Sequence, residues 1–470
     1  MEKSKGELLY EKLFDKKEYG FENISNEKRE KAFDFSEEYI KFLNECKTER
    51  ECSKYAEEFL KKKGFINIKK VENLYPGDKV YFINHQKSIY AAIIGENKLE
   101  KGFNLIGAHI DSPRLDLKPN PLYEGNGLAL FKTHYYGGIK KYQWTAIPLA
   151  IHGVIVTSNG NIIDINIGEH EKDPIFTITD LLPHLAQEQN KKTLDEGISG
   201  EELNLLIGSI PYQDEKIKEK VKLNILNILN KQYGITERDF ISSELELVPA
   251  FKAKSLGFDA SMVAGYGQDD RSCAYTALRA LTSTSNLKKT AIMLLSDKEE
   301  IGSMGNTGME SRIFESFVAE LLNKANEKSF DILNRTFSNS KMLSADVTSA
   351  SDPTYISVDE KYNAAYLGKG VVLSKYTGSK GKSGANDANA EFIAYIRKIF
   401  ETSNLMYQMS DMGKVDEGGG GTIAYILANK GIDVIDCGLS VLSMHSPYEV
   451  TSKFDIYNTY ECYKTFYERA

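Results

Sequence analysis

Short apolar runs that each lead into acidic residues or a histidine constrain the fold of this chain most strongly. The runs and the polar residues that follow them are Phe103–Ile106 with His109, Ala291–Leu295 with Asp297–Glu300, and Val434–Ile435 with Asp436. Helix-like segments lie between the runs, at Cys273–Leu281, Ala388–Phe400 and Thr422–Asn429. Buried strands that alternate with helices predict an α/β domain with a mainly parallel sheet. Such sheets bind ligands at the carboxyl ends of their strands, where these polar residues lie.

The amino-terminal region is predicted to be helical. Ala32, Phe35, Tyr39, Phe42 and Cys46 recur at steps of three and four residues, which places them on one helix face. Thr48 and Glu51 match the S/T-x-x-E pattern of a capping box and predict that a second helix begins there. We expect these helices to pack on the domain without contributing chemistry.

The region from Leu115 to Pro249 differs in composition from the rest of the chain, because it is rich in aromatic residues, glycine and β-branched residues. The runs Ile151–Thr157 and Ile162–Ile167 flank Ser158-Asn159-Gly160, a pattern that predicts a hairpin. We therefore expect a β-rich module, residues 115–249, inserted into an α/β domain made of residues 1–114 and 250–470.

The composition excludes several classes of protein. The 470 residues include 59 Lys and Arg against 67 Asp and Glu, a formal net charge of -8. This balance argues against a nucleic-acid partner, because duplex-binding surfaces need clustered positive charge. The longest apolar stretch, Thr145–Val156, is too short to span a membrane, and the amino terminus lacks the apolar run of a signal peptide. Five scattered cysteines without a CxxC pair fit a reduced, cytoplasmic protein.

Five segments carry residues suited to metal chemistry. They contain His109 with Asp111, Asp269 with Asp270, Glu299 with Glu300, Asp346, and His445. Each has an ordinary structural interpretation: a satisfied histidine, an acidic helix cap, or a solvated acidic pair. Together, two histidines and three acidic positions near strand ends can supply nitrogen and oxygen ligands for two divalent ions. No cysteine takes part, which favours a hydrolytic site over a structural zinc site.

The same segments resemble the successive motifs of the aspartyl aminopeptidase/vacuolar aminopeptidase I family of dinuclear zinc metallopeptidases. They are GAHIDSPRLDLKP, GYGQDDRS, SDKEEIGSMG, SADVTSASDP and LSMHSPYE, in that order. The resemblance implies a zinc-peptidase domain with an inserted β-rich dimerisation domain. It also implies two Zn²⁺ per subunit, with Co²⁺ or Mn²⁺ as possible substitutes, short peptide substrates, and a homo-oligomer, expected to be a tetrahedral dodecamer built from dimers.

The resemblance also implies a role for individual residues. His109 and Asp346 would hold one metal ion, and Glu300 and His445 the other. Asp269 would bridge the two ions, followed by Asp270 across a cis-type peptide. Glu299 would be the general base, and Asp111 would orient His109. Lys375 lies near the position of the family's substrate-binding lysine.

Three positions depart from the aspartyl branch of that family. Asp352-Pro353 stands where that branch has His-Pro, Ser383 stands near an expected tyrosine, and Glu188 replaces an expected histidine. We therefore expect neutral amino-terminal residues such as Leu to be cleaved at least as well as Asp.

The predicted function is a metalloaminopeptidase in which a water activated by two metal ions attacks the peptide bond. One alternative is a carboxypeptidase or amidohydrolase on the same metal fold. Another is a self-assembling scaffold without catalysis. The presence of Glu299 beside a complete ligand set argues against the scaffold, which has no evident need for a base.

Overall fold

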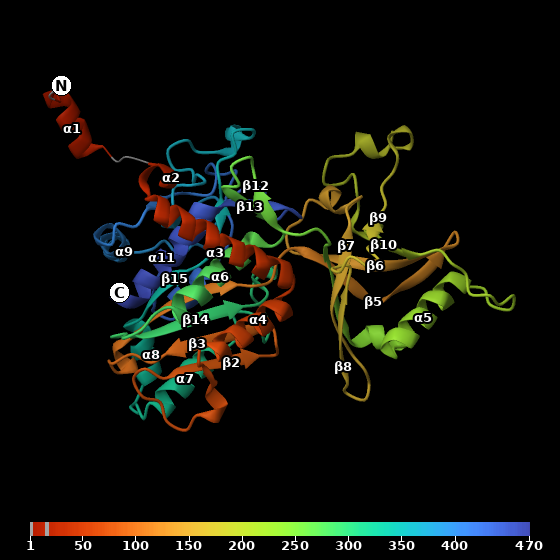
Figure 1. Ribbon diagram of the computed structural model, residues 1–470, viewed down its shortest axis with the longest axis horizontal. Helices are drawn as coiled ribbons and strands as arrows, with labels where there is room; N and C mark the ends of the chain where they lie inside the picture. The colour runs from red at the N-terminus through yellow and green to blue at the C-terminus, as the bar shows by residue number, and fades with distance from the viewer. Residues whose placement is uncertain (1–2, 15–17) are drawn as a thin grey trace.

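A nine-stranded sheet lies at the centre of the larger part of the computed structural model, which describes residues 3–14 and 18–470 (Figure 1). At its centre β14, β4, β15 and β19 run parallel, and β3 and β17 flank them in antiparallel pairings. In spatial order the strands are β1 (Ile66–Asn67), β2 (Lys79–Asn84), β3 (Ser88–Ile93), β14 (Thr290–Ser296), β4 (Phe103–His109), β15 (Lys341–Ser344), β19 (Asp433–Gly438), β17 (Val371–Ser374) and β18 (Tyr407–Met409). The prediction of an α/β fold with a mainly parallel sheet is confirmed.

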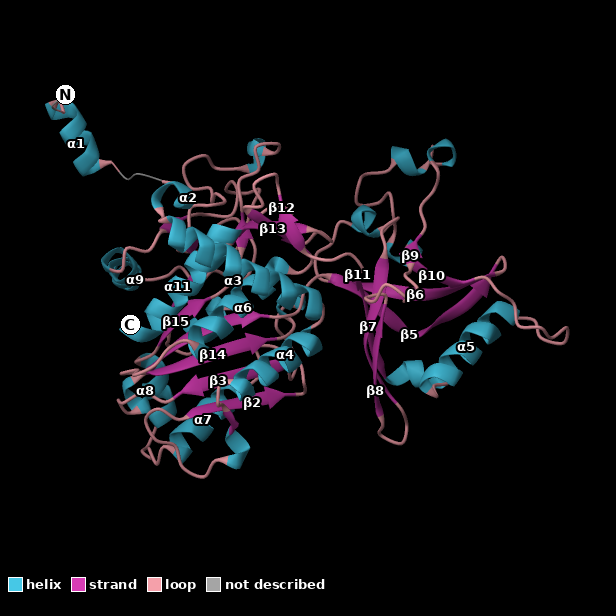
Figure 2. Ribbon diagram, in the orientation of Figure 1, coloured by secondary structure: helices cyan, strands magenta, loops and turns pink. Residues whose placement is uncertain are grey.

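Helices cover both faces of this sheet (Figure 2), which explains why its strands read as continuous apolar runs. Ala291, Met293 and Leu295 of β14 pack on one face, and Ile292 and Leu294 pack on the other. On the first face lie α3 (Asn26–Glu45), α4 (Glu49–Lys62), α6 (Gln268–Thr282), α9 (Ala390–Thr402) and α11 (Lys453–Arg469). On the second lie α7 (Ile313–Lys324), α8 (Ile332–Ser338) and α10 (Ala424–Ala428).

The helices predicted near the amino terminus are present. The periodic residues from Ala32 to Phe42 lie on α3, and Cys46 is its C-cap. Helix α4 begins at Glu49, and the predicted capping box of Thr48 and Glu51 forms its first turn. Two shorter helices precede them, α1 (Lys5–Leu13) and α2 (Gly20–Asn23). The helix expected over Thr422–Asn429 is shorter, because α10 covers only Ala424–Ala428.

A second, seven-stranded sheet lies to the side of the first, and all its pairings are antiparallel (Figure 2). Its strands are β8 (Ile162–Ile167), β7 (Leu149–Val156), β11 (Ser243–Pro249), β5 (Arg114–Gly125), β6 (Leu128–Tyr136), β10 (Asn204–Gly208) and β9 (Thr177–Ile178). The hairpin predicted around Ser158-Asn159-Gly160 is the β7–β8 pair. The helix α5 (Lys220–Tyr233) packs beside this sheet, and Trp144 is fully buried in its core.

Two small sheets pair segments that are far apart in the sequence. The strands β12 (Lys254–Leu256), β13 (Met262–Gly265) and β21 (Glu449–Ser452) form one, and β16 (Thr348–Ser349) and β20 (Ser440–Val441) form the other. The β13–β21 pairing brings the chain before Asp269 beside the chain after His445.

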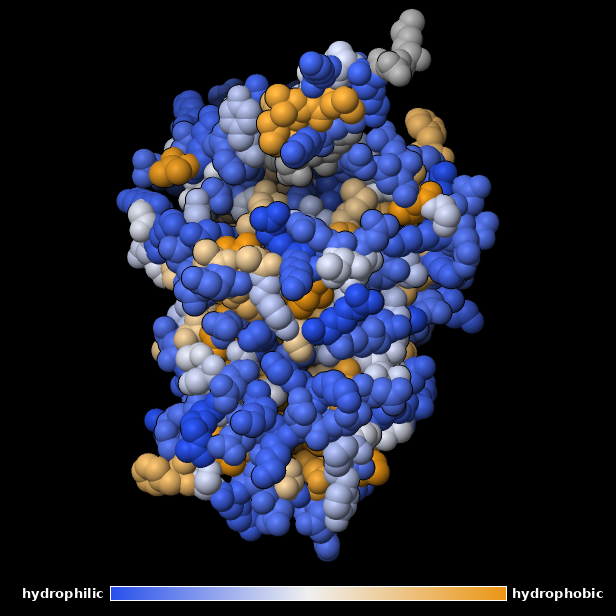
Figure 3. Space-filling view, turned by 90° about the vertical axis from the view of Figure 1, so that its left-hand side faces the viewer, coloured by the Kyte–Doolittle hydropathy of each residue, from blue (hydrophilic) through white to orange (hydrophobic). Residues whose placement is uncertain are grey.

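Helix α1 is the most exposed element at the amino-terminal end of the described residues. Helix α1 extends away from the rest of the chain and buries none of its side chains, and apolar surface is visible at that end of the molecule (Figure 3). Within the described residues, every helix is too short or too polar for a membrane-spanning segment.

Candidate metal centre

The predicted site residues come together at the carboxyl ends of the parallel strands. His109 ends β4, Glu299 and Glu300 follow β14 in a short 3₁₀ helix, and Asp346 follows β15. Because β14, β4 and β15 are neighbours, their ends lie side by side. Asp269, in the first turn of α6, and His445, in the turn between β20 and β21, complete the group.

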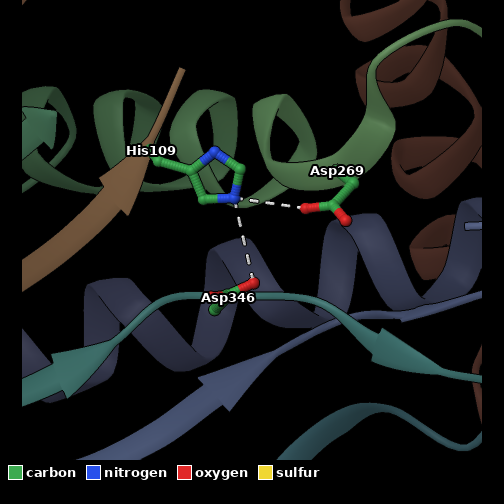
Figure 4. Close-up of side chains that lie close together, drawn as sticks. All are labelled: His109, Asp269 and Asp346. Carbon is green, nitrogen blue, oxygen red and sulfur yellow. Dashed lines mark ion pairs between the residues drawn. The ribbon is translucent and has the colours of Figure 1, made fainter. Parts of the chain in front are cut away.

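The two histidines face opposite oxygens of Asp269. His109 Nε2 lies 3.2 Å from Asp269 Oδ1, and His445 Nε2 lies 3.2 Å from Asp269 Oδ2. Figure 4 shows the first of these contacts together with Asp346, whose Oδ1 is 4.0 Å from the same nitrogen of His109. On the other side, Glu300 Oε2 is 3.6 Å from His445 Nε2. The arrangement therefore has two halves that share one carboxylate.

Three triplets in this group have ligand atoms within 4.8 Å of one another. They are His109, Asp269 and Asp346; Asp269, Glu300 and His445; and His109, Glu299 and Glu300. Two ligands of one tetrahedral zinc ion lie about 3.3 Å apart, given metal–ligand bonds of 2.0–2.2 Å. The separations around Asp269 match that value, and the first two triplets share Asp269.

The electrostatics of the group favour a bound cation. Burial, reinforced by neighbouring carboxylates, raises the pKa of Glu300 and of Asp346 well above the usual range. Burial lowers the pKa of His445, but Asp269 and Glu300 raise it overall to about 10. Glu300 Oε1 is also buried without a hydrogen-bond donor. A divalent cation would supply the positive charge that these carboxylates lack, so the residues present fit a metal ion.

Backbone carbonyl groups fix the orientation of both imidazoles. His109 Nδ1 donates to the carbonyl oxygen of Asp111 at 3.0 Å, and His445 Nδ1 donates to that of Gly138 at 2.9 Å. Because a carbonyl oxygen only accepts, each ring carries its proton on Nδ1 and presents Nε2 to the site. The side chain of Asp111 is more distant, with Oδ1 3.4 Å from His109 Nδ1.

The carboxylate of Asp111 mainly holds the backbone of the two glutamates. The N–H group of Glu299 donates to Asp111 Oδ1 at 3.1 Å, and that of Glu300 donates to Asp111 Oδ2 at 3.2 Å. The Tyr136 hydroxyl donates to Oδ2 at 2.9 Å. Asp270, which follows Asp269 through a cis peptide bond, accepts from the N–H group of His109 at 3.3 Å.

The pKa of the Glu299 carboxyl group is raised. Burial raises it to about 7, with Asp111 and Asp269 acting in the same direction and His109 and His445 opposing them. Its Oε2 lies 4.0 Å from His109 Nε2, so the carboxylate faces the region between the ligands. A base with a pKa near the working pH can both accept and return a proton.

Sequence patterns did not single out Glu449, Tyr136 or Gly138. Glu449 accepts from the N–H group of His445 at 2.8 Å and from that of Asp269 at 3.1 Å, and therefore ties the two segments together. Its position four residues after His445, at the start of β21, was the one available signal. The Tyr136 and Gly138 contacts join residues 25 and 307 positions apart, which no local pattern reveals.

The residues expected to affect substrate choice lie in different places. A cavity of about 860 Å³ has His445 and Asp352 in its wall. The ammonium group of Lys375 lies 3.5 Å from Asp387 Oδ1. Ser383 lies in a tight turn, and its N–H group donates to the carbonyl oxygen of Ser379 at 3.0 Å. The side chain of Glu188 is exposed and pairs with Lys191.

Known proteins are similar to this chain over nearly its whole length. The profile of the family described as aminopeptidase I zinc metalloprotease (M18) matches residues 42–467. A probable M18 family aminopeptidase 1 from Clostridium acetobutylicum is 52% identical over 456 residues, covering 96% of this chain and 98% of its own length.

Solved structures extend the similarity to the fold. An M18-family aminopeptidase from Thermotoga maritima has a TM-score of 0.94 at 45% identity, covering 97% of this chain and 100% of its own. Aminopeptidase I from Clostridium acetobutylicum has a TM-score of 0.91 at 50% identity, with the same coverage. The S. cerevisiae mApe1 dodecamer, at 24% identity and a TM-score of 0.75, covers 93% of this chain and 97% of its own and shares the fold.

Proposed function

The chain belongs to the aminopeptidase I zinc metalloprotease (M18) family, and we propose that it removes amino-terminal residues from short peptides with a two-metal site and Glu299 as the general base. It is accordingly a zinc metalloaminopeptidase, a hydrolase. The observation that carries the two-metal proposal is Asp269, whose two oxygens each lie 3.2 Å from the Nε2 atom of a different histidine.

In this proposal His109 and Asp346 hold one zinc ion, Glu300 and His445 hold the other, and Asp269 bridges them. Two of the ligand-distance triplets support that division, namely His109 with Asp269 and Asp346, and His445 with Asp269 and Glu300. Co²⁺ and Mn²⁺ accept the same nitrogen and oxygen ligands and are expected to substitute.

When bound, the ions would polarise the scissile carbonyl group and lower the pKa of the attacking water. The chain's own task is then proton transfer. Glu299 takes the proton of that water on its carboxylate and returns it to the departing amine. Asp111 keeps Glu299 in place through the backbone hydrogen bond at 3.1 Å.

The cavity beside His445 is proposed to receive the amino-terminal residue of the substrate. Its wall contains Ile139, Leu442 and Met444, which suit an apolar side chain. It also contains four carboxylates, namely Asp352, Asp359, Asp411 and Glu417, against the single ammonium group of Lys140. Because like charges repel, this wall disfavours acidic substrates, and we expect Leu to be cleaved at least as well as Asp. A contact of Lys375 with substrate is part of the same proposal.

We further propose that residues 115–249 form a dimerisation domain inserted between residues 1–114 and 250–470, which form the catalytic domain. The yeast relative's dodecamer supports a homo-oligomer, proposed to be a tetrahedral dodecamer built from dimers. A cytoplasmic location is proposed from the five cysteines, which are buried and unpaired.

A panel of fluorogenic aminoacyl substrates, together with product analysis of a short peptide, tests the function. We expect release of the amino-terminal residue first, with Leu substrates cleaved at least as fast as Asp substrates. Release of the carboxyl-terminal residue first would contradict the aminopeptidase assignment. Cleavage of only Asp and Glu substrates would contradict the proposed specificity.

A further inference from the structure

The end of strand β6 reaches from the seven-stranded sheet to the metal centre. We propose that Tyr136–Gly138 is a positioning segment for both halves of this centre, with Tyr136 holding the Glu299–Glu300 backbone through Asp111. The inference rests on the proposed function for its kinetic consequences, whereas its structural consequences concern metal binding alone.

The first contact runs through Asp111, which is fully buried. Its carboxylate accepts the Tyr136 hydroxyl at 2.9 Å and the N–H groups of Glu299 and Glu300 at 3.1 and 3.2 Å. A buried carboxylate is stable only when its oxygens are hydrogen-bonded. Without the hydroxyl, Oδ2 would keep only the longer bond from Glu300, and the carboxylate could turn. Any such rotation would move the backbone that carries the base and one metal ligand.

Tyr136 is itself held rigidly. The Arg114 guanidinium lies 3.9 Å from the centroid of the Tyr136 ring, directly across the β5–β6 pairing. Arg114 is in turn paired with Glu49 of α4 at 3.3 Å and with Glu246 of β11 at 3.1 Å. The ring therefore packs against an arginine that is held by one carboxylate from α4 and one from β11. Burial, with the nearby charge of Asp111, keeps the pKa of the phenol far above its usual value, so the hydroxyl remains a donor.

The second contact is made by the backbone two residues later. The carbonyl oxygen of Gly138 accepts from His445 Nδ1 at 2.9 Å and thereby directs Nε2 toward Asp269 and Glu300. Between the two contacts, Gly137 has a φ of +74° and packs against Glu300. A Cβ atom at Gly137 would lie 3.2 Å from both Cβ and Oε2 of Glu300, closer than ordinary contact. Glycine is required there both by the backbone conformation and by the approach.

These contacts give a segment of the antiparallel sheet a direct role at the metal centre. Tyr136 acts on the Glu299–Glu300 backbone, and Gly138 acts on His445 from the same three-residue stretch. Removing a residue that hydrogen-bonds to a metal ligand typically lowers metal affinity or activity by about 10–100-fold.

The experiment compares Tyr136→Phe with Tyr135→Phe in the 470-residue chain. Tyr135 precedes Tyr136 on β6 and is exposed. The control therefore makes the same chemical change, loss of a phenol hydroxyl, at a residue that does not bond to Asp111. For Tyr136→Phe we expect kcat to fall about 10–100-fold while KM stays within about two-fold of the wild type. Tyr135→Phe should match the wild type.

Metal binding provides the readout that does not depend on activity. Cobalt affinity, measured by competition with a chelator, should fall in Tyr136→Phe, and the visible absorption of the cobalt protein should change. A Gly137→Ala variant should show the same losses through the Glu300 contact, which keeps the test decisive if Tyr136→Phe fails to fold. Unchanged cobalt affinity and spectrum in folded Tyr136→Phe and Gly137→Ala would overturn the inference. Equal losses in Tyr135→Phe would overturn it too, since they would indicate a general effect on the strand.

The two proposals fail in different ways. If the wild type releases no amino-terminal residues, the proposed function fails, whereas a specific loss of cobalt affinity in Tyr136→Phe still supports the positioning role. If the wild type is an active aminopeptidase and Tyr136→Phe equals it in kcat, affinity and spectrum, only the positioning role fails.

Discussion

At the scale of single residues, the adjacent carboxylates of Glu299 and Glu300 lie near different histidines. Glu299 and Glu300 are consecutive, yet Glu300 Oε2 lies 3.6 Å from His445 Nε2, whereas Glu299 Oε2 lies 4.0 Å from His109 Nε2. Asp111 accepts one hydrogen bond from each backbone N–H group, so the pair is held as a unit. Their separate roles can therefore be distinguished by substituting each in turn.

Glu299→Gln should lower kcat by several orders of magnitude while both metal positions stay filled, because a base is lost and no ligand is. Glu300→Gln should instead reduce the metal content, since one ligand oxygen is replaced by an amide. Turnover and elemental analysis of the purified variants check both expectations. Metal loss in Glu299→Gln together with full occupancy in Glu300→Gln would mean that the two roles are reversed.

The site could be predicted from the sequence only where local pattern and position coincide. His109 ends a buried strand, Glu299, Glu300 and Asp346 follow one, and neighbouring parallel strands bring such positions together. The partners that hold them are different in kind. The contacts of Tyr136 and the Gly138 carbonyl arise from tertiary structure, and no local pattern reveals them. For Glu449 the one local signal is its position four residues after His445.

At the scale of elements, buried ion pairs join the corner between α3 and α4 to the antiparallel sheet. Lys47 Nζ lies 2.5 Å from Glu169 Oε1, and Lys252 also pairs with Glu169. His152 on β7 contacts Glu169 at 3.1 Å and Glu51 of the α4 capping box at 2.8 Å. The sequence predicted the capping box, which is local, but not its second use as a partner for a histidine 101 residues away.

These pairs make stability depend on pH in a definite direction. Burial raises the pKa of Glu169, but His152, Lys47 and Lys252 lower it overall to about 2, below its usual 4.5. A group whose pKa is depressed in the folded state contributes stability above its unfolded pKa and loses that contribution as the pH falls toward the folded value. A shift of this size corresponds to about 3 kcal/mol.

Glu169→Gln should therefore lower the thermal unfolding midpoint at pH 7, and the difference from the wild type should narrow between about pH 5 and pH 2. Unfolding followed by circular dichroism across this range checks the trend. Glu188→Gln is a suitable control, because that side chain is exposed on the surface. A difference that stays constant from pH 7 to pH 2 would contradict the electrostatic explanation.

At the scale of the whole molecule, the candidate metal centre joins distant parts of the chain. Its residues come from His109 through His445, and His109 and Asp269 are buried. Because a ligand that binds only the folded state stabilises it, metal ions should raise the unfolding temperature as well as support catalysis.

Exhaustive dialysis against a chelator should abolish hydrolysis and lower the thermal unfolding midpoint, and Zn²⁺, Co²⁺ or Mn²⁺ should restore both. Activity assays and calorimetry before and after metal addition check this, with elemental analysis to verify the metal content. Full activity in protein with a metal content near zero would contradict the metallopeptidase assignment.

Assembly is the last property at this scale, and the seven-stranded sheet supplies the argument. Beside it lies a cavity of about 850 Å³ whose wall is largely apolar and includes Leu128, Ile175 and Ile228. Ile175 and Ile228 are 59% and 47% exposed in the single chain, and exposed apolar clusters of this kind mark interaction sites. The proposed dimerisation through residues 115–249 would cover them.

We therefore expect light scattering to show that the wild type is a homo-oligomer. The double variant Ile175→Asp, Ile228→Asp should lose its dimer contact, because dimerisation would bury two charges without partners. Phe330→Asp alters an exposed apolar residue outside residues 115–249 and should keep at least the dimer. If dimer contacts complete the substrate cavity, the dissociated variant should also lose activity on short peptides while its circular dichroism spectrum is retained. A wild-type monomer with full activity would contradict the proposed assembly, and a dissociated variant that cleaves peptides as fast as the wild-type oligomer would contradict its link to catalysis.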